Sequence, residues 1–165
     1  MTWLWEFNLT TMLLLITAAW RWGAAPERLC VAVIVFMNLG DRLYHAVIDR
    51  GTIYASVDLG HLFIDVTAAA VFIGVALSAN RVYPLWLSAF QLVSVISHFA
   101  REVDAKLVKS AYGLMTYGPF YFILLILAGG IWMHARRVKR YGPYPPWRTS
   151  SNPSRAASRK LPPTG

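Results

Sequence analysis

Five long stretches of mainly apolar residues, separated by short polar segments, make up most of the chain. They cover approximately residues 2–20, 29–48, 54–79, 85–103 and 112–132. Each stretch has about the 20 residues that a helix needs to cross a hydrocarbon core roughly 30 Å thick. The pattern therefore predicts an all-α integral membrane protein, with a bundle of about five transmembrane helices forming one domain over residues 1–135.

The composition agrees with this pattern and narrows the class of protein. Hydrophobic residues make up 56% of the chain, more than the roughly 45–50% that is usual for a soluble domain. A single cysteine, Cys30, excludes an internal disulfide framework. It begins an apolar stretch, so we expect it to pack in the interior rather than to act as a nucleophile.

The last segment, residues 136–165, differs from the rest of the chain. It is rich in proline, serine and arginine and has no apolar period, which predicts a disordered basic tail. Basic residues beside a membrane segment favour the cytoplasmic side and attract anionic lipid headgroups. We therefore expect a multi-pass protein of the cell membrane with a cytoplasmic tail and no nucleic-acid partner. The candidate lipid contacts are Arg136, Arg137, Lys139 and Arg140.

Three ionisable residues interrupt the third apolar stretch. Asp58, His61 and Asp65 stand at positions i, i+3 and i+7, which places them on one face of a helix. Charged groups are costly inside a bilayer and mostly face other helices or a hydrated cavity. We therefore expect these side chains to point toward neighbouring helices.

The second and fourth stretches carry similar polar faces. Asp41 and His45 lie near the end of the second, and His98 and Glu102 lie near the end of the fourth. Short connections make the second, third and fourth helices antiparallel neighbours. Their polar segments then meet on one side of the membrane. The candidate metal or proton ligands are His45, His61, His98, Asp41, Asp58, Asp65 and Glu102.

Several chemistries suit such a cluster. Histidines with carboxylates can bind a divalent metal ion such as zinc, iron or manganese, or can pass protons through the membrane. Two histidines on facing helices can also hold a haem, which we rank below a metal ion. In the alternative interpretation the carboxylates form ion pairs with Arg42 and Arg101, and the cluster only holds helices together.

These interpretations lead to different functions. The first is a binding or transport module for a metal ion or protons. The second is a structural or accessory subunit of a membrane complex, with a partner protein in the bilayer. A haem-binding redox subunit or a membrane hydrolase comes third. The chain has no HExxH, CxxC, GxGxxG or phosphate-loop motif, so we name no catalytic residue and leave open whether the protein is an enzyme.

Overall fold

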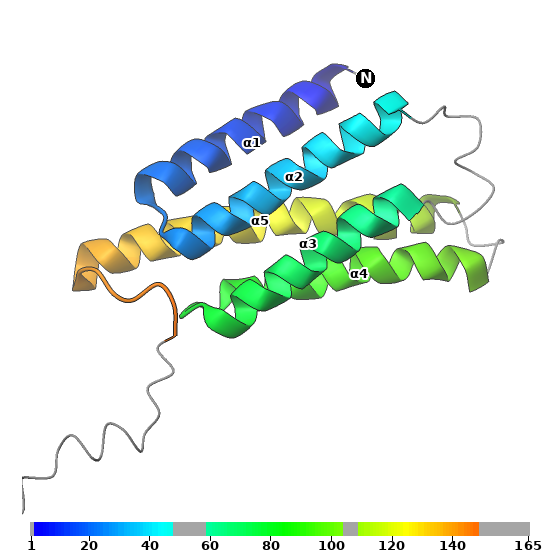
Figure 1. The fold of residues 1–165 in the computed structure, drawn as a ribbon. Coiled ribbons are helices and arrows are strands. Elements are labelled where there is room, and N and C mark those ends of the chain that lie inside the picture. The colour runs from blue at the N-terminus through cyan, green and yellow to red at the C-terminus, as the bar shows by residue number, and fades with distance from the viewer. Residues whose placement is uncertain (1, 48–58, 104–108, 149–165) are drawn as a thin grey trace, which may run out of the picture.

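The computed structural model is a bundle of five helices (Figure 1). It describes residues 2–47, 59–103 and 109–148, and the side chains of residues 6–47, 59–99 and 118–148. The helices are α1 (Thr2–Trp22), α2 (Ala25–Val47), α3 (Leu59–Ser78), α4 (Tyr83–Val103) and α5 (Lys109–Tyr141).

Consecutive helices run in opposite directions, so α2, α3 and α4 are antiparallel neighbours as predicted (Figure 1). Helix α5 packs against α4, α2 and α1. We call the end that holds the last residues of α2 and α4 the loop end. The opposite end holds the last residues of α1, α3 and α5, and we call it the tail end. Polar stripes of α2, α3 and α4 therefore lie toward the loop end.

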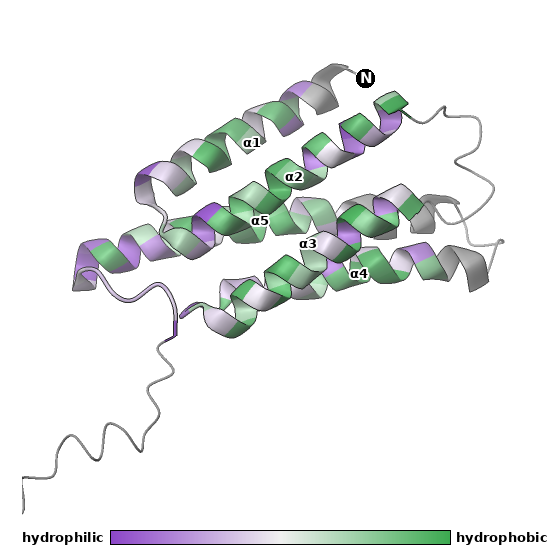
Figure 2. Cartoon of the chain, viewed as in Figure 1, coloured by the Kyte–Doolittle hydropathy of each residue, from purple (hydrophilic) through white to green (hydrophobic). Residues whose placement is uncertain are grey.

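Apolar side chains fill the interior and also cover the outside of the bundle. Phe72, Leu87, Ile123 and Leu127 are completely buried in the core. Figure 2 shows that apolar residues are spread along the helices, and many of their large side chains are exposed. A soluble protein rarely exposes large areas of apolar surface. Outward-facing apolar residues include Leu13, Leu43, Val47, Phe63, Leu77, Leu85, Leu125 and Met133.

Three helical segments are long and apolar enough to cross a membrane: Ala25–Val47, Leu59–Ser78 and Gly118–Tyr141. The predicted all-helical architecture is confirmed. The length and composition of the helices support three membrane spans among the described residues, rather than the five that the sequence pattern predicts. Helices α1 and α4 have 21 residues each but are not among these three segments.

Helix α2 begins earlier than predicted. Residues 21–28 were expected to form a loop, but the helix starts at Ala25 with Pro26 in its first turn, where proline needs no helical hydrogen bond. The Glu27 carboxylate accepts a hydrogen bond from the backbone N–H of Ala24 at 2.9 Å. This contact satisfies one of the free N–H groups at the helix start. The local capping therefore extends α2 beyond its apolar stretch.

Helix α5 also extends beyond its apolar stretch, and the predicted disordered tail begins too early. Residues 136–141 are helical, because basic side chains at a helix C-terminus interact favourably with its dipole. Gly142 then ends the helix at a φ of +82°, a conformation that suits glycine, and its N–H bonds the carbonyl of Val138. Residues 149–165 lie outside the described part of the chain.

Residues 142–148 fold back across the tail end, and we call them the C-terminal strap. The N–H of Asn80 donates to the carbonyl of Pro146 at 3.0 Å, and the N–H of Arg148 donates to that of Ser78 at 2.7 Å. Trp147 packs against the core. The strap is thus an ordered part of the bundle, attached to the turn between α3 and α4.

Candidate functional site

Asp41, His45 and His61 form a compact group at the loop end, which we call the metal triad. Asp41 and His45 lie one turn apart on α2, and His61 faces them from α3. The Asp41 Oδ1 atom is 2.7 Å from Nε2 of His61 and 3.5 Å from Nε2 of His45. All three possible ligand atoms lie within 4.8 Å of one another. The triad therefore gathers two nitrogen donors and one oxygen donor around a single point.

The metal triad has the chemistry of an open metal site. Zinc binds imidazole nitrogens and carboxylate oxygens at about 2.0–2.2 Å, and three protein ligands leave a fourth position for water or a substrate. Ligand atoms around such an ion are about 3.3 Å apart, so the Asp41–His61 contact would open slightly on binding. The Asp41 side chain is 51% exposed and His45 34%. An ion could therefore reach the site and leave it.

An aromatic side chain holds the two imidazoles of the triad in place. The Tyr44 ring contacts those of His45 and His61 edge-on, at centroid distances of 5.8 and 5.0 Å. It packs directly on Gly60, where any Cβ atom would collide with it. The Nδ1 atom of His45 has no hydrogen-bond partner among the described residues. The His45 ring is thus positioned by packing, and no described hydrogen bond engages its Nδ1 atom.

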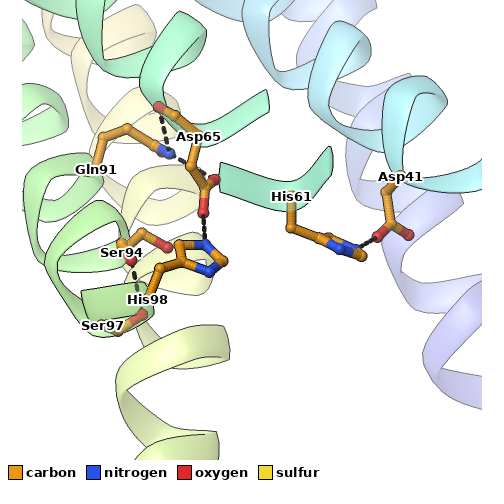
Figure 3. A network of polar contacts seen from close by, with 7 residues as sticks. All are labelled: Asp41, His61, Asp65, Gln91, Ser94, Ser97 and His98. Carbon is orange, nitrogen blue, oxygen red and sulfur yellow. Dashed lines mark hydrogen bonds and ion pairs between the residues drawn. The ribbon is translucent and has the colours of Figure 1, made fainter. Parts of the chain in front are cut away.

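A second pair of polar side chains joins α3 to α4. The Nε2 atom of His98 lies 2.9 Å from Oδ2 of Asp65, and Gln91 donates to Oδ1 of Asp65 at 2.8 Å (Figure 3). His98 is 6% exposed and Asp65 14%. The Asp65 carboxylate thus has a partner on each oxygen, as a buried carboxylate needs.

Figure 3 shows that the two His–Asp contacts lie on different sides of α3. His61 turns toward Asp41 of α2, whereas Asp65 turns toward α4. The sequence placed both on one face, but four residues rotate a helix about 40° past a full turn, and the two side chains reach different neighbours. His98 is therefore not grouped with His45 and His61.

Of the other residues predicted to belong to the polar cluster, only Arg42 has a described side chain. Asp58 lies outside the described residues, and the side chains of Arg101 and Glu102, in the last turn of α4, are also outside them. Arg42 is exposed on α2, and its charge attracts the Asp41 carboxylate. The carboxylates of Asp41 and Asp65 both have histidine partners.

The serines near His98 do not form a hydrolytic arrangement. The Ser97 hydroxyl donates to the carbonyl of Ser94 at 2.6 Å (Figure 3), a backbone contact that is usual for serine in apolar helices. Cys30 is completely buried in the core, as predicted. These contacts give the hydrolase interpretation no support.

Sequence reasoning missed a third polar group, at the tail end. Nε of Arg81 donates to Oε1 of Glu27 at 2.8 Å, with the Glu27 side chain fully buried and that of Arg81 5% exposed. In the sequence Glu27 looks like an ordinary acidic residue of the polar segment before the second apolar stretch. Arg81 looks like a solvated residue in a turn. No periodic pattern links residues 54 positions apart, so the sequence carried no signal for this pair.

The C-terminal strap completes this third group. The ring of Tyr144 lies 4.3 Å from the Arg81 guanidinium carbon and 4.1 Å from that of Arg137. The Tyr144 hydroxyl is 3.0 Å from Nδ1 of His134, which is itself buried. We call Glu27, Arg81, His134, Arg137 and Tyr144 the tail-end polar centre.

Comparisons of the chain with protein-family models, characterised proteins and solved structures find no match. The function must therefore be argued from the site itself.

Proposed function

We propose that this protein is a small multi-pass membrane protein that binds a divalent transition-metal ion through the metal triad. The observation that carries the proposal is the convergence of the Asp41, His45 and His61 ligand atoms within 4.8 Å. Two nitrogens and one oxygen suit Zn²⁺ or a similar ion better than Mg²⁺ or Ca²⁺, which prefer oxygen ligands alone.

The position of the triad favours a binding or transport module over a structural metal site. A structural zinc site is normally closed by four protein ligands, whereas the triad supplies three and is partly exposed. His61 lies two residues from the start of α3, and His45 two residues from the end of α2. In the proposed orientation, the ion would sit near the membrane face opposite the basic tail.

We further propose that all five helices cross the membrane, with the tail in the cytoplasm. Helices α3 and α5 both end at the tail end of the bundle (Figure 1). The chain between them must return to the loop end, and α4 makes that return. Helix α1 packs antiparallel against α2 and also contacts α5. Arg136, Arg137, Lys139 and Arg140 would then lie at the cytoplasmic headgroups.

Zinc titration of the full-length protein, purified in detergent without metal, tests this function. We expect one ion to bind per chain. His61→Ala and Asp41→Ala should each weaken binding at least about 100-fold, because the loss of a residue that only hydrogen-bonds a zinc ligand already costs roughly 10–100-fold. His98→Ala and Asp65→Asn are matched controls, since they alter the other His–Asp pair, and should bind zinc as the unaltered protein does.

Two results would overturn the metal site. One is zinc binding that does not exceed that of a protein-free detergent blank. The other is an equal loss of affinity in the triad variants and in the matched controls. Thermal unfolding of every variant, followed by circular dichroism, checks that each protein remains folded.

A further inference from the structure

The tail-end polar centre holds more positive than negative charge. Arg81 and Arg137 both lie within 4.3 Å of the Tyr144 ring centroid, and His134 contacts its hydroxyl. Glu27 is the carboxylate that faces them. The charge of Arg81 is therefore balanced by Glu27. No described carboxylate lies within salt-bridge distance of Arg137.

A buried donor of Arg81 is also unused. Nε bonds Glu27 and Nη1 bonds the carbonyl of Asn80, but Nη2 has no hydrogen-bond partner among the described residues although it is buried. An unpaired buried donor on a charged group is unfavourable. The free energy of this centre would fall if a further acceptor, preferably an anionic one, reached Nη2.

The Tyr144 ring lies beside both guanidinium groups. Its contact with them is of the cation–π type. Phosphate oxygens accept charge-assisted and often bidentate hydrogen bonds from arginine, which are stronger and directional. The strap that carries Tyr144 is held to the turn after α3 by two backbone hydrogen bonds and by Trp147. A phosphate could thus replace the ring without unfolding a helix.

We infer that Arg81 and Arg137 form a binding site for a phosphate group, which the C-terminal strap covers with Tyr144. The phosphate can belong to the headgroup of an anionic phospholipid or to a free phosphate ion. The site is separate from the metal triad, which lies at the other end of the bundle, and it does not depend on metal binding.

The depth of the site fits a headgroup. Helix α5 has 33 residues and is therefore about 50 Å long, which exceeds the roughly 30 Å of a hydrocarbon core. Its last turns, with Arg137, lie beyond the apolar part of the helix. Basic pockets between membrane helices on the cytoplasmic side are known to take phosphorylated headgroups.

Native mass spectrometry of the detergent-purified full-length protein with short-chain phosphatidic acid tests the inference. Arg137→Gln should reduce the bound fraction at least about tenfold, the effect of one charge-assisted hydrogen bond of roughly 1.5–3 kcal/mol. Arg136→Gln is the matched control. It removes the same charge from the neighbouring position, where the guanidinium lies over Trp132 at 5.2 Å. Arg136 contributes only general attraction to anionic headgroups, so its loss should reduce the bound fraction far less than the loss of Arg137 does.

Two further variants test the roles of Arg81 and of the strap. Arg81→Lys keeps the charge that Glu27 needs but loses the planar fork, so it should weaken phosphatidic acid binding while the protein stays folded. Tyr144→Ala should strengthen binding severalfold, because it removes the ring that covers the buried Arg81 guanidinium and lies against that of Arg137. Circular dichroism melting checks the fold of each variant.

The second arm separates the two sources of phosphate. Titration with inorganic phosphate followed by calorimetry should give binding if the phosphate group alone suffices. Binding of phosphatidic acid without binding of inorganic phosphate assigns the site to a lipid headgroup. Binding of both ligands, or of phosphatidic acid alone, supports the phosphate site. Equal losses in Arg136→Gln and Arg137→Gln would show nonspecific attraction to the basic end and overturn the site. So would the absence of binding by both ligands.

Discussion

The Glu27 carboxylate accepts a 2.8 Å hydrogen bond from Nε of Arg81, and this contact joins the start of α2 to the turn before α4 inside the protein. The same carboxylate caps α2 through the N–H of Ala24. One side chain therefore links the beginning of a helix to a segment 54 residues away. The contribution of this link can be measured as a change in the free energy of unfolding.

Removing either partner of this pair should destabilise the protein strongly. Glu27→Gln or Arg81→Gln leaves one buried group without its counter-charge, which typically costs about 3–5 kcal/mol. The double variant should lose less than the sum of the two single variants, because it leaves no unpaired charge. Chemical unfolding in detergent measures these free energies. Arg28→Gln, which alters an exposed arginine on α2, is the control and should change stability little.

The adjacent glycines of α5 should respond differently to alanine. A Cβ atom at Gly130 would come within 2.7 Å of the Tyr83 ring, whereas one at Gly129 would meet nothing within 4 Å. Gly130→Ala should therefore cost about 1–3 kcal/mol through overpacking. Gly129→Ala should be neutral or stabilise the helix by up to about 1 kcal/mol. Comparison of their unfolding midpoints checks the prediction, and equal effects would contradict the close packing of α4 on α5.

Asp65 should tolerate asparagine but not alanine. Asparagine can still accept a hydrogen bond from Gln91 and donate one to His98, which needs only a change of tautomer. Asp65→Asn should therefore change stability by less than about 1 kcal/mol. Asp65→Ala leaves both partners unsatisfied, at about 1–3 kcal/mol each. Thermal melts of the two variants decide this, and a large loss in Asp65→Asn would indicate that the charge itself is needed.

Zinc affinity should fall as the pH is lowered. Protons compete with the metal for the imidazoles of His45 and His61. At a pH where both imidazoles are protonated in the free protein, zinc must displace two protons to bind. Each further decrease of one pH unit should then lower the zinc affinity about tenfold for each displaced proton, which corresponds to about 1.4 kcal/mol per proton. His45→Ala should reduce the slope from about two protons to about one. Titrations across the acidic range give the slope, and a slope near zero would exclude histidine ligands.

Reporter fusions should place the turn between α3 and α4 on the same side as the tail. Reporters inserted after Asn80 and after Arg148 should both report cytoplasm, and one placed before Thr2 should report the outside. If the reporters after Asn80 and Arg148 both lie in the cytoplasm and the reporter before Thr2 lies outside, the result supports an odd number of membrane spans. A periplasmic signal after Arg148 would contradict the orientation, and disagreement between Asn80 and Arg148 would contradict the helix arrangement.

The sequence by itself determined the all-helical architecture and the helix on which each described candidate residue lies. Apolar stretches of about 20 residues predict helices because their backbone groups must bond internally in an apolar medium. The polar positions of α2, α3 and α4 follow from helical periodicity, and short connections made these helices antiparallel. The predicted approach of His61 to the α2 residues Asp41 and His45 follows from those two facts and is present in the structure.

Tertiary structure alone decided which polar residues contact one another. His61 and Asp65 share one helix face, yet they pair with α2 and α4 respectively, because α3 lies between those helices and small angular differences select the neighbour. The Glu27–Arg81 pair and the ordered strap depend on contacts between distant segments, which no local period records. Helix ends were also misplaced, since capping by Glu27 and Gly142 extends α2 and α5 beyond the apolar residues that marked them.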